Sequence, residues 1–197
     1  GIHTYWGDGK DWYNYAGFLW PKFLAEWTGD NAIVRKIWLR FGQNPGDNIF
    51  TDINYTLSGQ EYESSLNEAV TKYAEWRYFT GTRDDGEHFD NADELPTSVI
   101  FSTNEEDQIN GFGGTVYLQF IPQLGLMEIS FDGEDNNLWQ ASIIQEKFGP
   151  PSNTVDLPLD NYSAGSADIE TEGCANIVLM PILFSDVTKK SYSYNYM

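Results

Sequence analysis

The chain has 197 residues, enough for one large domain or two small ones with buried cores. Its 30 acidic residues against 11 basic ones give a formal net charge of -19, and such a surface repels nucleic acid and anionic lipid. With 16% aromatic residues, the composition also excludes a disordered chain.

The single cysteine, Cys174, excludes an internal disulfide and any metal site built from several thiolates. It precedes an apolar run at 175–180, so we expect it to be buried as a small hydrophobic residue. No apolar stretch approaches the roughly 20 residues that cross a bilayer, so we expect no membrane span. An acidic surface of this kind is typical of extracellular, cell-surface or salt-tolerant proteins.

The first 95 residues have the periodicity of helices. Aromatic and apolar residues between Trp12 and Trp27 recur in steps of three and four, which makes one apolar stripe. Pro21 should kink this helix or stand in the first turn of a second segment, and Gly29 ends it. Asp30 or Asn31 is expected to cap the next helix. The predicted buried face of that helix is Ile33, Ile37, Trp38 and Phe41.

Two further helices follow before the chain changes character. One is predicted over 48–57 and ends at Gly59. The other begins at Ser65, which stands three residues before Glu68 as in a capping box, and stops at Gly81.

After Pro96 apolar residues alternate with polar ones, which indicates strands. Glycines at 111, 113, 114, 125 and 133 mark turns between them. The sequence therefore predicts an α+β fold, in which a helical subdomain at 1–95 precedes an antiparallel β-sandwich domain at 96–197. Tyr192, Tyr194 and Tyr196 should point to one side of the last strand. The expected strands are 97–103, 115–121, 126–131, 138–144, 175–184 and 191–196.

The inventory of catalytic side chains is short. Only His3 and His88 could act as an imidazole base, and neither stands in an H-E-x-x-H zinc motif or beside a G-x-S-x-G nucleophile elbow. No catalytic residue and no zinc ligand is therefore predicted, and whether the chain belongs to an enzyme is left open. Carboxylate pairs of the kind that glycosidases use are expected by chance among 30 acids.

Two acidic segments offer oxygen ligands that suit calcium, which is the one cofactor the residues suggest. The first contributes Asp84, Asp85, Glu87 and Asp90, and a solvated linker between the two halves is the alternative. The second places Asp132, Glu134 and Asn136 at alternate positions, like part of an EF-hand loop. It lacks the glycine and the closing glutamate of that loop, so a turn between strands is the alternative.

Two helical segments carry a resemblance to a known family. Residues 13–29 lead into the Ile33–Trp38 segment, and residues 65–83 close on Phe79-Thr80-Gly81-Thr82-Arg83. These segments resemble the region after the active site of secreted zinc metallopeptidases related to the immune-inhibitor type. The resemblance implies helices that pack beneath a zinc-binding helix, followed by an accessory β-sandwich. The H-E-x-x-H helix of that family has no counterpart here.

Three functions remain open on these grounds. The first is the non-catalytic C-terminal part of a secreted metallopeptidase-like protein, with an N-terminal catalytic segment of the same precursor as its partner. The second is an extracellular module that binds surface polysaccharide or calcium, with Tyr117, Trp139 or Tyr162 exposed on a sheet face. The third is a surface-layer or filament subunit whose last strand, or aromatic N-terminal arm, pairs with a neighbour.

Overall fold

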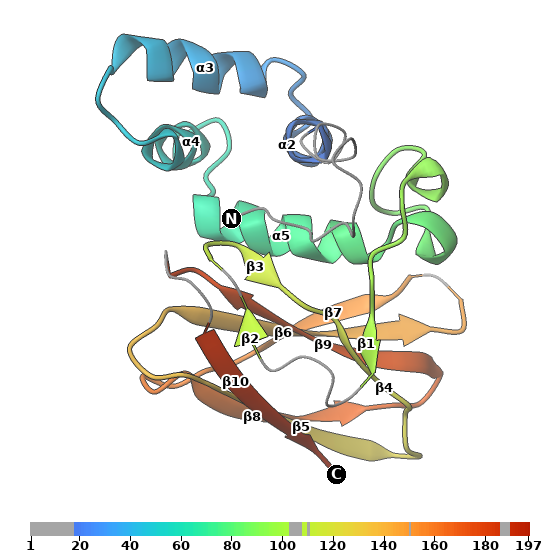
Figure 1. Cartoon of the computed structure of the whole chain (residues 1–197). Helices are drawn as coiled ribbons and strands as arrows, with labels where there is room; N and C mark the ends of the chain where they lie inside the picture. Colours follow the sequence, from blue (N-terminus) through green and yellow to red (C-terminus); the bar gives the residue numbers. More distant parts are fainter. Residues whose placement is uncertain (1–17, 103–107, 110, 150, 186–189) are drawn as a thin grey trace, which may run out of the picture.

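The computed structural model describes residues 18–102, 108–109, 111–149, 151–185 and 190–197. Helices come first and strands follow, so the predicted α+β class with a helical N-terminal part and a β-sandwich is confirmed (Figure 1). The helical part consists of α2 (Leu19–Thr28), α3 (Ile33–Gln43), α4 (Ile49–Leu57), α5 (Leu66–Tyr78) and the short 3-10 turns η1 (Gly81–Arg83) and η2 (Ala92–Glu94).

The ends of the helices follow the local signals. Pro21 stands in the first turn of α2, and Gly29 ends that helix at a φ of 68°, which a residue without a Cβ adopts at no steric cost. The Asn48 side chain accepts a hydrogen bond from the Phe50 N–H at the start of α4. The Ser65 hydroxyl accepts one from the Glu68 N–H at the start of α5, so the predicted cap at Ser65 is confirmed, whereas α3 starts after Ala32 without the side-chain cap expected from Asp30 or Asn31. The expected stripe upstream of Phe18, including Trp12, lies outside the described residues.

The predicted buried face of α3 is partly wrong. Ile33 and Ile37 are buried, but Trp38 is 60% exposed and Phe41 is only partly buried. Successive residues of an α-helix are about 100° apart, so Trp38 cannot share the direction of Ile37. The helix packs mainly on α2 and α4, and these leave most of the indole uncovered.

Two sheets form the sandwich. Within the described residues one is six-stranded with the order β1-β4-β9-β6-β7 and β3 also on β9, and the other is four-stranded with the order β2-β10-β5-β8. All pairs are antiparallel except β1 with β4. The strands are β1 (Phe101–Ser102), β2 (Gln108–Ile109), β3 (Gly114–Thr115), β4 (Leu118–Phe120), β5 (Leu126–Gly133), β6 (Trp139–Lys147), β7 (Asn153–Leu157), β8 (Ala164–Glu170), β9 (Cys174–Leu183) and β10 (Lys190–Tyr196).

Strands β6 and β9 lie at the centre and are buried on both faces. Ile143 and Leu179 belong to the core between the two sheets, whereas their neighbours Ile144 and Val178 belong to the core beneath the helices. A strand covered on both sides needs apolar residues at every position, which explains the unbroken apolar run of β9. Cys174 is buried at its start, as expected.

The remaining expectations for the β half have mixed outcomes. The last strand does turn its three tyrosines to one side, and they pack on Phe131 and Phe120. The expected exposure of Tyr117 and Trp139 is wrong, because both are buried by the core, while Tyr162 is exposed. Strands β2, β7 and β8 were not predicted, and the segment expected over 115–121 is divided between β3 and β4.

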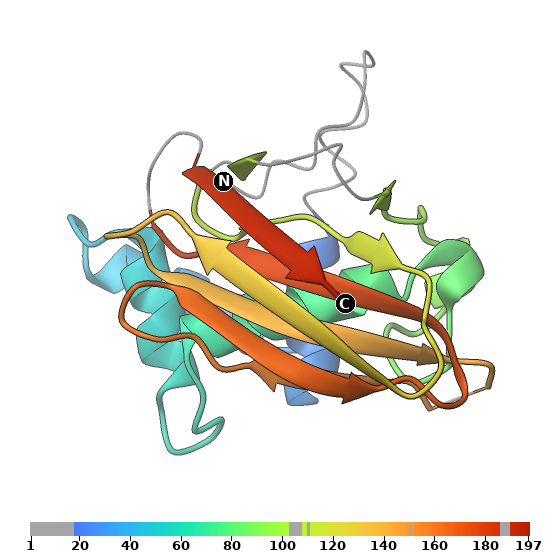
Figure 2. The same cartoon turned by 90° about the horizontal axis from the view of Figure 1, so that it is seen from below.

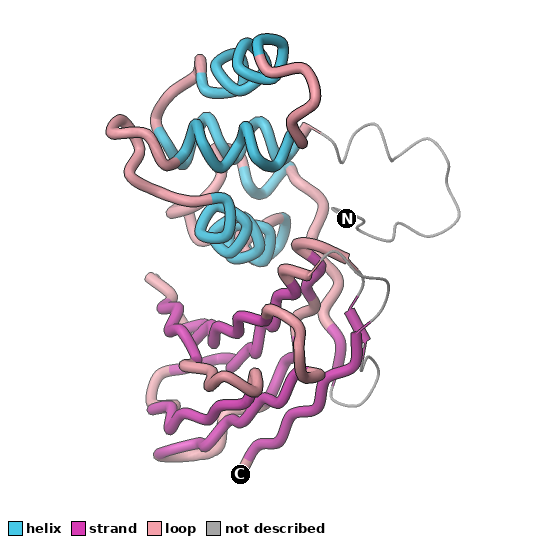
Figure 3. Tube along the Cα trace, turned by 90° about the vertical axis from the view of Figure 1, so that its left-hand side faces the viewer, coloured by secondary structure: helices cyan, strands magenta, loops and turns pink. Residues whose placement is uncertain are grey.

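The helices cover only the outer face of the six-stranded sheet (Figures 1 and 2). Helix α5 lies directly on it and is tied down by hydrogen bonds from Tyr78 to Glu146 (2.8 Å) and from Tyr117 to the Ala74 carbonyl (2.6 Å). Helices α2 and α4 lie on α5, and α3 is outermost, so the molecule is built in successive layers (Figure 3). Burial raises the pKa of the Tyr117 hydroxyl well above its usual range, so it remains a hydrogen-bond donor.

No helix among the residues with a described position has the length and apolarity that a membrane crossing requires.

Candidate functional site

The first acidic segment is the loop that follows η1, and its carboxylates make hydrogen bonds within the loop. Asp84 accepts a hydrogen bond from the Gly86 N–H at 2.8 Å. The same oxygen of Asp85 accepts the Glu87 N–H at 3.1 Å and lies 2.8 Å from the Nδ1 atom of His88. Both carboxylates therefore organise the loop itself, while the side chains of Glu87 and Asp90 face solvent.

His88 has a packing role in this loop. Its ring stacks on Phe79 with centroids 4.3 Å apart and meets the edge of Trp76 at 5.7 Å. Its Nδ1 atom faces Asp85, so the ring is held by one carboxylate and two aromatic rings. His3, the other histidine, lies outside the described residues.

The second acidic segment is the turn between β5 and β6. Glu134 pairs with Lys190 at 2.7 Å, and that ammonium lowers the pKa of the Glu134 carboxyl. Asn136 adopts the left-handed conformation that a tight turn needs, with a φ of 63°. The turn interpretation is thus supported by the geometry, and Asp132 is exposed at the end of β5.

The two segments do not converge on one ion in the part of the chain that the structure describes. Within these ranges no three His, Cys, Asp or Glu side chains are arranged to hold a metal. Calcium binding by Asp84, Asp85, Glu87, Asp90, Asp132, Glu134 or Asn136 stays a prediction.

An apolar cavity of about 210 Å³ opens where the helices meet the turn before β3. Phe50, which is partly exposed, and Phe112 stand across it with ring centroids 5.1 Å apart. The described lining residues include no carboxylate, imidazole or amine, so this lining suits an apolar group. Its lining consists of Trp20, Ile49, Phe50, Ile53, Leu66, Val70, Tyr73, Phe112 and Gly113.

A buried polar pair lies on α5 behind that cavity. Tyr73 and Arg77 are 8% and 6% exposed, and neither the Tyr73 hydroxyl nor the Arg77 Nε has a hydrogen-bond partner among the described residues. No described carboxylate lies within ion-pair distance of Arg77. Burial raises the pKa of the Tyr73 hydroxyl, so it is protonated at neutral pH. The sequence could not single out these residues, because their helical spacing is that of an ordinary core face.

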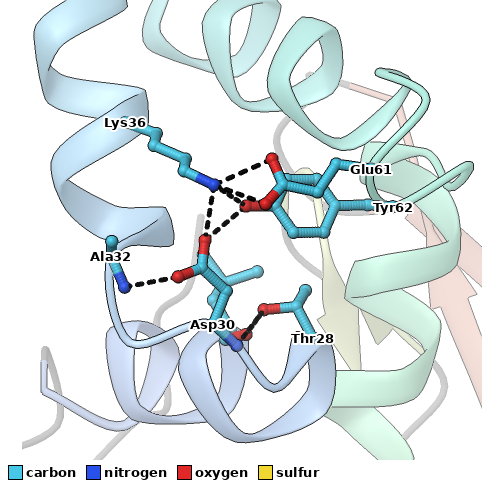
Figure 4. A network of polar contacts seen from close by, with 7 residues as sticks. Thr28, Asp30, Ala32, Lys36, Glu61 and Tyr62 are labelled. Carbon is cyan, nitrogen blue, oxygen red and sulfur yellow. Dashed lines mark hydrogen bonds and ion pairs between the residues drawn. The ribbon is translucent and has the colours of Figure 1, made fainter.

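A polar network holds the turn between α2 and α3 against the turn before α5 (Figure 4). Lys36 lies 2.9 Å from an oxygen of Asp30 and 2.7 Å from one of Glu61, and the Tyr62 hydroxyl donates to Asp30 at 2.5 Å. The hydrogen bonds from Tyr62 and Lys36 lower the pKa of Asp30 to about 2. The same carboxylates, Glu61 foremost, raise the pKa of Lys36. Each of these four side chains thereby has a partner within the network, so the network holds the α2–α3 turn against the α4–α5 turn.

The outermost surface of the helical layer exposes large apolar side chains, with the exposed Arg35 beside them on α3. Trp38 is 60% and Leu39 is 53% exposed on α3, and the Phe41 ring meets the edge of Trp38 at 5.8 Å. Helix α3 is outermost and packs on α2 and α4, and both of these apolar side chains remain exposed on it (Figure 1). We call Trp38, Leu39 and Phe41 the α3 face. A surface of this kind is typical of contact with another polypeptide.

Comparisons with known proteins give little beyond this geometry. No family model and no curated protein matches the chain. Among solved structures it is similar to a family GH115 4-O-methyl-α-glucuronidase with specificity for decorated arabinogalactans, at 8% identity and a TM-score of 0.28. That alignment covers 85% of this chain and 28% of the glucuronidase.

Proposed function

We propose that this chain is a non-catalytic part of a secreted zinc-metallopeptidase-like protein, in which the helical layer supports a catalytic segment and the sandwich is an accessory domain. The proposal joins two independent lines. One is the resemblance of residues 13–29 and 65–83 to the region after the active site in such peptidases. The other is the α3 face, which is the observation that carries the proposal.

The geometry suits a supporting role. Burying a large aromatic side chain stabilises an interface by a few kcal/mol, so a Trp that is 60% exposed is a strong anchor for a partner. The Lys36–Asp30 contact stiffens the turn at the start of α3, and a buried ion pair between Arg40 and Asp52 joins this helix to α4. A partner that binds the α3 face would therefore meet a preorganised surface.

The decisive experiment is to isolate the native protein with an antibody against this chain and measure its intact mass, its partners and its zinc content. The proposal expects a longer polypeptide, or a tight complex, that carries an H-E-x-x-H helix, one zinc ion and chelator-sensitive peptidase activity. A native species of 22.4 kDa that has no such partner would overturn it.

The α3 face is tested in the same complex. Trp38→Glu should weaken association of the two parts about tenfold or more, because the aromatic anchor is replaced by a charge. Val99→Glu is the matched control, since Val99 is 65% exposed but lies in the segment between η2 and β1. Equal affinities of the two variants would remove the α3 face from the proposal.

A further inference from the structure

Three loops lie side by side at one end of the sandwich. The Thr171 N–H donates to the Gly125 carbonyl at 3.0 Å, and its hydroxyl lies within hydrogen-bond distance of the carbonyls of Gln123 and Gly125. The Phe148 N–H donates to the Gly173 carbonyl at 3.1 Å. The β4–β5, β6–β7 and β8–β9 connections are therefore neighbours, at the right-hand end of the sandwich in Figure 1.

Large apolar side chains stand out from this end. Leu124 is 104%, Ile121 is 85% and Phe148 is 84% exposed, and Leu126 is 63% exposed at the start of β5. Exposures this high mean that the side chains project individually and are not packed into a patch of the surface. We call these four residues the loop tips.

The loop tips are also free of charge along the chain. Residues 121–126 and 148–153 contain no Asp, Glu, Lys or Arg, in a chain of which 21% is charged. The opposite end of the sandwich is different, because exposed Leu138 and Tyr162 stand there among Asp132, Glu134, Asp135 and Asp160. The two loops that carry the tips could therefore leave water without burying a charge of their own, whereas the β8–β9 turn at the same end carries the exposed Glu172.

We propose that the loop tips insert into a lipid surface with neutral or zwitterionic headgroups. Uncharged loops with projecting Leu, Ile and Phe side chains can enter the region between headgroups and acyl chains at no cost for desolvating a charge. Projecting tips suit a fluid surface that closes around each of them, whereas a protein interface requires a packed, continuous patch.

The negative charge of the molecule determines which lipid headgroups it can approach. Glu128, Glu170 and Glu172 lie at the same end of the sandwich, on β5, β8 and the β8–β9 turn, and Glu170 is opposite Leu126. Together with the formal net charge of -19 they oppose approach to an anionic headgroup, which is an effect of the whole molecule that added salt weakens. Lys147, whose ammonium donates to the Glu172 carbonyl, is the described cation nearest the tips along the chain. This inference is independent of the proposed function, since it concerns other elements.

Vesicle flotation with the purified full chain tests the proposal. The probes are phosphatidylcholine vesicles, and the same vesicles with one third phosphatidylglycerol, both at millimolar lipid. Wild type should bind the first and bind the second more weakly. Leu124→Asp and Phe148→Asp should each lower the partition coefficient about tenfold or more, the loss expected for one large apolar side chain.

Leu138→Asp is the matched control, because it adds the same charge at an exposed leucine of the opposite end. It should leave binding unchanged, and urea unfolding midpoints verify that all variants fold. Failure of wild type to float with phosphatidylcholine, or an equal loss in Leu138→Asp, overturns the proposal. So does self-association without vesicles that Leu124→Asp abolishes, since the tips would then be a contact between copies of this chain.

Discussion

A buried ion pair couples α3 to α4 and gives the sharpest test of the structure. The Asp52 side chain is fully buried, and the Arg40 Nε lies 2.9 Å from its Oδ1 while the Arg40 side chain is 26% exposed. Neither atom makes a well-directed hydrogen bond, so charge and not hydrogen-bond geometry joins them. The Arg40 guanidinium also stacks on Tyr55 at 3.4 Å. The two partners are thus unequal, since only Arg40 can reach water.

This inequality predicts unequal costs. Arg40→Met leaves the Asp52 carboxylate buried without a partner, and loss of one member of a buried pair costs about 3–5 kcal/mol. Asp52→Asn removes the charge and leaves a buried amide, at about 1–2 kcal/mol. The double variant should therefore be about 2 kcal/mol more stable than Arg40→Met alone.

Urea unfolding followed by tryptophan fluorescence measures these differences at pH 7. A double variant that is no more stable than Arg40→Met alone would refute the reasoning, and so would an Asp52→Asn variant that loses as much stability as Arg40→Met.

Two further predictions concern the polar network and a glycine. Asp30 has a pKa of about 2, lowered from 3.8 by Tyr62 and Lys36, so its contribution to stability is present above about pH 4 and lost as the pH falls through 2. Between pH 4 and 2 wild type should lose more stability than Asp30→Asn in an acid titration, and parallel losses would contradict this. Gly133→Ala would place a Cβ 2.6 Å from the Trp139 ring. It should cost about 1–3 kcal/mol in urea unfolding, whereas Gly149→Ala, with open space around its Cβ, should cost less than half of that.

The sequence predicted those elements whose burial leaves a periodic or continuous apolar signal. Strands β6 and β9 have such a signal because both of their faces are covered. The start of α5 was predicted from a different signal, the capping pair of Ser65 and Glu68. Strands β7 and β8 escaped prediction because they lie at sheet edges. Their side chains are mostly polar and solvent-facing, so alternation is weak even though the backbone pairs regularly.

The candidate sites were harder to foresee for a different reason. The cavity lining comes from α2, α4, α5 and the turn before β3, so no local pattern contains it. Trp38 was misplaced because apolar character alone does not tell which direction of a helix is covered. The carboxylates of Asp84 and Asp85 are of the type that binds calcium. In the folded loop, however, both accept hydrogen bonds from backbone N–H groups, and Asp85 also contacts His88.

The two surfaces proposed for interaction lie on different parts of the molecule. The α3 face is outermost in the helical layer, the loop tips lie at the end of the sandwich, and α5 with the six-stranded sheet lies between them (Figure 1). Substitutions at distant sites without shared partners act additively, so Trp38→Glu should not change vesicle binding and Leu124→Asp should not change association with a catalytic segment. A variant that weakens both would mean that one event depends on the other. A layered molecule with two separate contact surfaces could bind a partner protein and a lipid surface at the same time, which is how an accessory domain would hold a peptidase at a membrane.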